Sequence, residues 1–276
     1  MIKSLFKKRP KELTPVVHRK REPERYEQEK QKARSKNAGE REKLARNPKT
    51  HLEILYYLAE DEDAQVRRAV AANPATPVQV SENLAKDEDI DVKLHLIKRL
   101  GALLPALSEE QHAHLYAFAV QALGVLALDE VLKVRMALTS VLKDHAYAPP
   151  EVAKQLARDI EREVSEPILR YCAALSDEDL LDILSEHPSD WVVEAIASRV
   201  SVEEPVSDSV INTESRPGGR ALILNKGAKI SEATMHKIIE IARETPEWHK
   251  PLALRKHLSR DIIQDIMVFI DKSLHS

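Results

Sequence analysis

Residues 45–70 read ARNPKTHLEILYYLAEDEDAQVRRAV, and residues 71–96 read AANPATPVQVSENLAKDEDIDVKLHL. The two stretches are copies of one unit at an offset of 26 residues, and ten of their positions are identical. The shared positions include an Asn-Pro pair, a threonine, a Leu-Ala pair and an Asp-Glu-Asp run. A fixed period of roughly 20–50 residues is typical of stacked repeat proteins. The sequence therefore predicts a repeat architecture rather than a compact enzyme fold.

Each copy carries the signals for two short helices. A helix should end before each Asn-Pro pair, because proline disfavours the helical region for the residue that precedes it. Thr50 and Thr76 are the predicted N-caps of the next helix, and the Glu or Gln three residues later completes a capping box. The Asp-Glu-Asp run suits the start of a second helix, whose N-terminus favours negative charge. An apolar stripe on that helix, Val66, Ala69 and Val70 in the first copy, predicts burial against neighbouring units.

The stretch VRRAVAANPATPVQVSENLAKDEDIDV, residues 66–92, resembles the leucine-rich-repeat variant, and the unit more broadly resembles HEAT-like repeats. Some members of the variant family carry a cysteine-bound iron–sulfur cluster, which the single cysteine of this chain, Cys172, cannot supply. The fold class expected from the period and the resemblance is all-α, an α-solenoid (superhelix) of stacked HEAT-like helical repeats.

An acid precedes a base by six residues three times, and each base directly follows a valine. In HEAT-like arrays such residues form a ladder between stacked units, and the resemblance implies a structural ladder here. Charge-assisted hydrogen bonds between neighbouring turns are the favoured interpretation, and a ligand-binding arginine is the alternative. The residues concerned are Asp61 and Arg67, Asp87 and Lys93, and Asp129 and Arg135.

The rest of the chain, from about residue 92 to residue 270, resembles the bacterial domain-of-unknown-function family 2336, common in alphaproteobacteria. The segments that carry this resemblance are ILRYCAALSDEDLLDIL (168–184), EAIASRVSVEEPVSDSVI (194–211), LILNKGAKISEATM (222–235) and LALRKHLSRDII (252–263). They consist mostly of capping and packing residues, so the resemblance implies helical pairs and transfers no catalytic residue.

Charge divides the chain into a basic arm and an acidic body. Residues 1–46 hold 16 Lys and Arg against 7 Asp and Glu, a net charge of +9, and the remainder holds 26 against 38, a net charge of −12. Residues 1–43 are predicted to be a disordered basic arm with a transient helix over residues 24–34. Residues 44–276 are the predicted helical repeat domain, with variant-like units over 44–105 and divergent HEAT-like pairs over 106–276.

The tip of the arm combines basic and apolar residues. A polyanion or an anionic membrane surface is the predicted contact of this tip, and a solvated tail is the simpler alternative. The residues concerned are Lys3, Leu5, Phe6, Lys7, Lys8 and Arg9.

Catalytic and cofactor motifs are missing from the sequence. There are 11 histidines but no HExxH motif and no His-Glu dipeptide, and neither a nucleotide-binding nor a nucleophile-elbow motif occurs. We therefore predict no catalytic residue, no cofactor and no metal. Cys172, Trp191 and Trp248 are interpreted as packing residues.

These observations favour a non-catalytic protein-binding scaffold or regulatory adaptor of the bacterial cytoplasm. The alternative is a nucleic-acid-binding helical-repeat protein that uses its basic arm. The expected partners are unidentified proteins, with weak membrane or nucleic-acid contact through the arm. No transmembrane segment or signal peptide is expected, so the predicted location is the cytoplasm, with the inner-membrane periphery as a further option.

Overall fold

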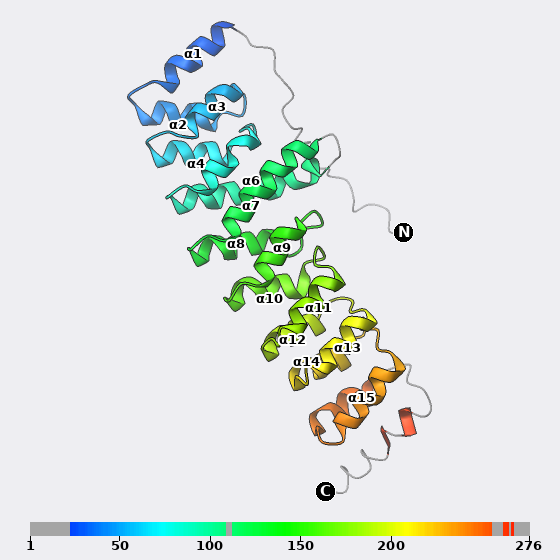
Figure 1. Cartoon of the computed structure of the whole chain (residues 1–276). Helices are drawn as coiled ribbons and strands as arrows, with labels where there is room; N and C mark the ends of the chain where they lie inside the picture. The colour runs from blue at the N-terminus through cyan, green and yellow to red at the C-terminus, as the bar shows by residue number, and fades with distance from the viewer. Residues whose placement is uncertain (1–22, 109–111, 256–261, 265, 268–276) are drawn as a thin grey trace, which may run out of the picture. The chain divides into compact units, whose positions relative to one another are not determined.

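A computed structural model describes residues 23–108, 112–255, 262–264 and 266–267. The described part of the chain is built from helices, and its only paired extended residues form an isolated bridge between Val202 and Ala228 (Figure 1). The all-helical prediction is therefore confirmed. The described residues divide into two compact units, one up to residue 142 together with 147–152, the other comprising 143–146 and the residues from 153 onward.

The first unit is built from two sets of helices. The even-numbered helices α2, α4, α6 and α8 contact one another in chain order. In the second set, α1 contacts α3 and α5 contacts α7. Its elements are α1 (Pro23–Ala33), α2 (Ala38–Arg46), α3 (Leu52–Leu58), α4 (Ala64–Ala72), the 3₁₀ helix η1 (Val78–Val80), α5 (Ser81–Ala85), α6 (Ile90–Leu107), α7 (Ala113–Ala127) and α8 (Leu132–Leu142).

The second unit repeats this pattern. Helices α10, α12, α14 and α16 contact one another in order, and so do α11, α13 and α15. Both units are consistent with a stacked repeat arrangement. The elements are α9 (Pro150–Ala157), which spans the boundary, α10 (Arg162–Tyr171), α11 (Asp177–Ser185), α12 (Asp190–Ala197), α13 (Glu204–Asn212), α14 (Arg216–Leu224), α15 (Glu232–Ala242), the 3₁₀ helix η3 (Pro246–Trp248) and α16 (His249–Leu254).

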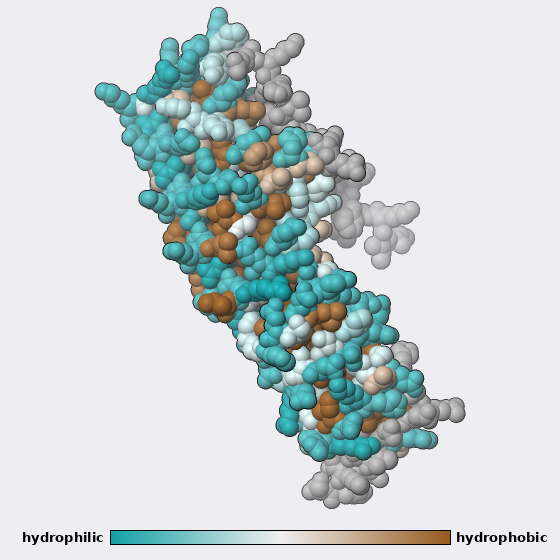
Figure 2. Space-filling model, viewed as in Figure 1, coloured by the Kyte–Doolittle hydropathy of each residue, from teal (hydrophilic) through white to brown (hydrophobic). Residues whose placement is uncertain are grey.

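Apolar residues fill the space between the two sets of helices. The predicted stripe of α4 is buried, because Val66, Ala69 and Val70 are each at most 4% exposed. Leu55 and Leu58 of α3 are fully buried as well. On the face drawn in Figure 2, apolar side chains lie in patches separated by hydrophilic residues. None of the helices in the described ranges has the length and apolar character needed to cross a membrane.

Residues 23–43 of the predicted arm are not disordered: they form α1, at the position of the predicted transient helix over 24–34, and most of α2. Helix α2 is a further copy of α4, since Arg41 and Asn47 lie 26 residues before Arg67 and Asn73. The sequence of α2 is so polar that the repeat cannot be recognised from an apolar stripe. The charged side chains nevertheless find partners inside the fold, and Glu29 and Arg41 are both only 6% exposed.

The predicted capping boxes at Thr50 and Thr76 are also wrong. The N-cap of α3 is His51, and no side chain caps that helix. Thr50 Oγ1 instead donates a hydrogen bond to the carbonyl of Leu44 at 2.7 Å, and Thr76 Oγ1 donates to Val70 at the same distance. The Asn-Pro turn carries each threonine back to the end of the preceding helix, where carbonyl groups lack helical partners.

Close packing in the second unit depends on a glycine. An added Cβ at Gly219 would lie 2.3 Å from Cζ2 of Trp248, whose ring is 2% exposed. Trp248 Nε1 also donates to the carbonyl of Arg216 at 3.1 Å. The predicted packing role of Trp248 is confirmed, since its ring packs against Gly219 of α14.

We predict that Gly219→Ala lowers the thermal unfolding midpoint, because overpacking against a rigid ring typically costs about 1–3 kcal/mol. The matched control is Gly124→Ala in α7, where an added Cβ has no heavy atom within 4 Å. That substitution should be neutral or stabilising, because alanine favours helices by up to about 1 kcal/mol over glycine. Circular dichroism melting of both variants provides the test, and equal midpoints would contradict the close approach.

Candidate functional site

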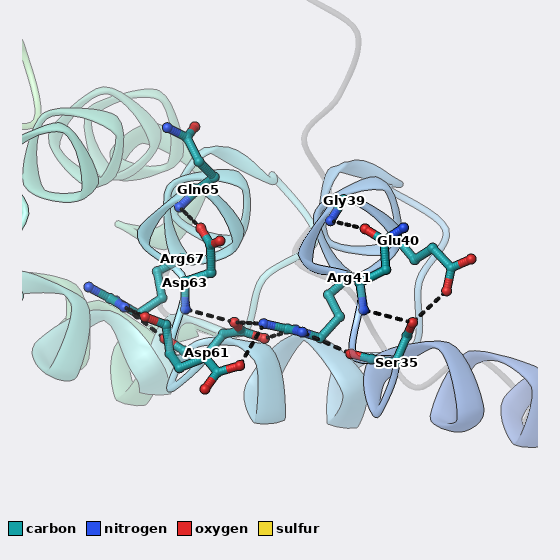
Figure 3. A network of polar contacts seen from close by, with 10 residues as sticks. Ser35, Gly39, Glu40, Arg41, Asp61, Asp63, Gln65 and Arg67 are labelled. Carbon is teal, nitrogen blue, oxygen red and sulfur yellow. Dashed lines mark hydrogen bonds and ion pairs between the residues drawn. The ribbon is translucent and has the colours of Figure 1, made fainter.

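Ion pairs connect the even-numbered helices of the first unit in series. Arg41 Nε and Nη2 donate to the two carboxylate oxygens of Asp61 at 2.7 and 2.8 Å (Figure 3). Arg67 Nε and Nη2 donate to Asp87 at 2.6 and 3.0 Å. Lys93 Nζ donates to Asp129 at 2.6 Å. We call these three pairs the aspartate ladder.

The predicted residues thus meet, but in a different pairing. Arg67 donates to the carboxylate of Asp87, so the predicted pairing of its side chain with the Asp61 carboxylate is replaced by a contact to the next unit. Arg67 Nη1 instead donates to the backbone carbonyl of Asp61 at 2.7 Å, and Arg135 Nη1 donates to the carbonyl of Asp129 at 2.7 Å. A guanidinium carries five donors, so one arginine holds its own turn and the carboxylate of the next unit.

Each aspartate also organises its own turn. Asp61 Oδ1 accepts a hydrogen bond from the backbone N–H of Asp63 at 2.9 Å, and Asp87 accepts from Asp89 at 2.9 Å. Asp63 in turn caps α4 by accepting from Gln65 N at 2.8 Å. The short Asp side chain therefore links the end of one helix, the start of the next and the neighbouring unit.

Burial favours the structural interpretation of this ladder. The side chains of Arg41 and Asp61 are 7% and 5% exposed, and Asp87 and Asp129 are each 6% exposed. The hydrogen bonds from Arg41 to Asp61 raise the pKa of the arginine above its usual value. Desolvated, bidentate pairs of this kind are geometric constraints, and their atoms are not available to a ligand.

The sequence did not predict a second series of contacts, which reaches residues at or shortly after the C-terminal ends of the even-numbered helices. Asn73 Nδ2 donates to the carbonyls of Ala45 and Asn47 at 2.6 and 3.1 Å. Arg99 stands 26 residues later and donates to the Thr76 carbonyl at 2.8 Å and to Ser81 Oγ at 2.9 Å. The identity of Asn47 and Asn73 in the repeat was the available signal.

The same device recurs within the second unit. Asn225 Nδ2 donates to Ala197 and Arg199 carbonyls at 2.8 and 2.7 Å. Arg199 donates to the carbonyls of Leu169 and Cys172 at 2.6 and 2.9 Å, and Arg255 donates to that of Ile223 at 2.9 Å. We call Asn73, Arg99, Arg199, Asn225 and Arg255 the carbonyl ladder. Cations and N–H donors suit this position because helix C-termini carry partial negative charge.

Burial lowers the pKa of the arginines of the carbonyl ladder. Arg99 is 5% exposed, and burial lowers its pKa to about 10. Its Nε has no hydrogen-bond partner among the described residues. Burial likewise lowers the pKa of Arg199 and of Arg255. At neutral pH Arg99 remains charged, and backbone and hydroxyl oxygens solvate it.

Two surface depressions lie in the first unit. The larger, which we call the α3 cleft, has a volume of about 640 Å³ and has the Arg41–Asp61 pair among its lining residues. Its remaining lining residues are Ala33, Arg34, Ser35, Lys36, Glu53, Tyr56, Tyr57, Glu60 and Glu62. The smaller, of about 310 Å³, includes Arg46, Arg68 and His95. Arg68 there donates to Asp89 at 2.9 and 2.5 Å, so its charge is already compensated.

Cys172 and Trp191, both interpreted from the sequence as packing residues, lie in the second unit. Cys172 is fully buried, and burial raises the pKa of its thiol, which disfavours the reactive thiolate. The guanidinium of Arg162 lies 5.4 Å from the centre of the Trp191 ring. Across the described ranges, His, Cys, Asp and Glu form no group of three arranged to hold a metal ion. The predicted contact residues Lys3, Leu5, Phe6, Lys7, Lys8 and Arg9 lie outside the described residues.

We predict that Arg67→Ala destabilises the protein by about 1–3 kcal/mol, because it leaves the buried Asp87 carboxylate without its partner. Asp87→Ala should have a similar effect, and the double variant should cost less than the sum of the two, which a denaturation cycle measures. Arg46→Ala is the control, since Arg46 is 66% exposed and pairs with Glu42 on its own helix. An Arg67→Ala effect no larger than the control would refute the ladder.

Acid should weaken the connection between α4 and α6. The hydrogen bonds from Arg68 hold the pKa of Asp89 below its usual 3.8. A lowered pKa stabilises the fold fully above the unfolded value, and this contribution disappears as pH falls through the folded value. Arg68→Met should therefore lower the melting temperature at pH 6, and the difference from wild type should shrink below about pH 4. A pH-independent difference would speak against this pair.

Comparison with known proteins adds a family for the C-terminal part. No curated protein matches the chain significantly. The segment matched by a family model begins within α10 and includes the remaining helices of the second unit. The predicted resemblance is confirmed for this part of the chain. Residues 164–276 match the family described as "Uncharacterised protein conserved in bacteria (DUF2336)".

Proposed function

We propose that the protein is a non-catalytic protein-binding scaffold or regulatory adaptor of the bacterial cytoplasm, built as an α-solenoid of HEAT-like repeats. The bacterial family match and the ordered contacts within each set of helices support this proposal. Stacked helical pairs present long surfaces that suit extended partners, and such surfaces are the usual functional feature of this architecture.

The observation that carries the proposal is the use of the buried charged residues. In the first unit the buried Arg41 and Arg99 bind an aspartate and a carbonyl group outside their own helices, and in the second unit the half-buried Arg199 binds a carbonyl group of α10. An active site would instead place perturbed acids, bases or nucleophiles in a cleft. The α3 cleft has a compensated ion pair in its lining, and aromatic and charged side chains surround it. Such a lining suits recognition of another protein better than chemistry.

The test is affinity capture on the immobilised full chain, followed by titration of each purified candidate against the chain by calorimetry. We expect at least one protein that binds saturably with a fixed stoichiometry. The same chain is titrated with duplex DNA between 50 and 200 mM salt. DNA affinity that falls steeply with salt, together with no stoichiometric protein partner, would replace the scaffold by the nucleic-acid alternative, because phosphate contacts release counterions.

A further inference from the structure

Two adjacent tyrosines on α3 depart from the repeat. Tyr56 and Tyr57 are 52% and 58% exposed, and the positions 26 residues later hold Glu82 and Asn83. The second copy thus folds with polar residues where the first copy has aromatic rings. Stacking of the units does not require these rings. Exposed neighbouring aromatic side chains are typical of recognition surfaces, because they offer large contact area at low entropic cost.

Both tyrosines line the α3 cleft, together with charged residues. Glu53 belongs to α3, as the two tyrosines do, and Glu60 and Glu62 follow this helix. The turn that follows α1 supplies Arg34 and Lys36. Carboxylates therefore predominate on the side of the cleft that carries the rings.

The ion pair in the lining does not change this balance. Arg41 and Asp61 neutralise each other, and both are buried. Glu62 Oε1 lies 3.3 Å from Arg41 Nη2, while its side chain is 86% exposed. With every charged lining residue counted, the cleft holds four acids and three bases, a net charge of −1. A cation is therefore favoured over an anion beside the tyrosines.

We propose that the α3 cleft binds a lysine- or arginine-bearing extended segment of a partner protein. The cationic group would lie over a tyrosine ring and within reach of the carboxylates on the same side. The ring quadrupole attracts a cation over an aromatic face, more strongly when the cation is desolvated. The cleft volume of about 640 Å³ suits a few side chains of such a segment. The inference rests on the proposed function and names its site and partner chemistry.

The chain itself contains a competing segment of the same chemistry. Residues 1–22 hold eight Lys and Arg against two Asp and Glu. A tethered segment has a high effective concentration near its own fold. Occupation of the cleft by this segment is therefore an outcome that the experiment must separate from binding of a partner.

The experiment measures fluorescence anisotropy of two labelled peptides with the full chain at 50 mM salt. One peptide carries four lysines spaced by glycine and serine, and the other carries glutamine in place of each lysine. We expect the lysine peptide to bind and the glutamine peptide not to bind. The double variant Tyr56→Ser/Tyr57→Ser should weaken binding by about tenfold, and Glu60→Gln by about threefold, as loss of a cation–π contact and of one carboxylate implies.

Matched controls come from the second unit. Tyr171→Ser removes a tyrosine that is 50% exposed, and Glu178→Gln neutralises an exposed acid. Both should leave the peptide affinity within about twofold of wild type, since neither lines the cleft. Equal affinity of the two peptides, or an equal loss in the control variants, would overturn the proposal, because binding would then be unspecific. All changes are on the surface, and unchanged melting temperatures verify folding.

A further variant of the full chain, Lys7→Gln/Lys8→Gln/Arg9→Gln, separates the two sources of cations. Unchanged peptide affinity supports a partner segment. A rise in affinity that disappears in the tyrosine double variant would assign the cleft to the chain's own segment and overturn the proposal. A captured partner that binds wild type and the tyrosine double variant equally would refute the cleft while leaving the scaffold intact. Peptide binding without any captured protein partner would refute the scaffold while leaving the cleft as a binding site for cationic segments.

Discussion

The fold of the first unit depends on the buried contact between a basic side chain in one repeat and an aspartate in the next. The Arg41–Asp61 pair is almost completely removed from solvent. Such a pair adds little net stability relative to apolar residues, yet removing one partner typically costs about 3–5 kcal/mol. The contact therefore selects one register between neighbouring helices. A shifted stacking would bury the same charges without partners, which makes the ladder a device for specificity as much as for stability.

The carbonyl ladder provides the complementary constraint at the other end of the even-numbered helices. Aspartates bind N–H groups and guanidinium groups near the helix starts. Asn73 binds carbonyl groups at the end of α2, and Arg99 binds the Thr76 carbonyl in the turn after α4. Both devices satisfy backbone groups that helix termini leave without partners. The carbonyl ladder recurs within the second unit at Arg199 and Asn225, where the DUF2336 match also lies. Two stretches with little sequence identity thus use the same solution to the same problem.

The sequence predicted the helical class, the period, the two helices of each copy and most residues of the aspartate ladder. It did not predict their partners, because spacing within one copy says nothing about which residue of the next copy lies opposite. Thr50 has the side chain of an N-cap, but the Asn-Pro turn brings it to the Leu44 carbonyl instead. Helix α1 lies where a transient helix was predicted, but the polar composition gave no sign that it packs into the fold, since Glu29 is buried only because His51 and Arg25 bind it. The same polar composition hid α2. The α3 cleft combines segments whose proximity only the fold reveals.

Each ion pair of the aspartate ladder holds one repeat to the next. Amide hydrogen exchange of the full chain with the Asp61→Asn substitution tests it most directly, because this change removes a charge and preserves shape. We expect faster exchange in α2 and α4, the helices that Asp61 connects, and unchanged protection in α7 and α8, since repeats depend on nearest neighbours. Unchanged exchange in α2 and α4, or an equal increase throughout the first unit, would contradict it.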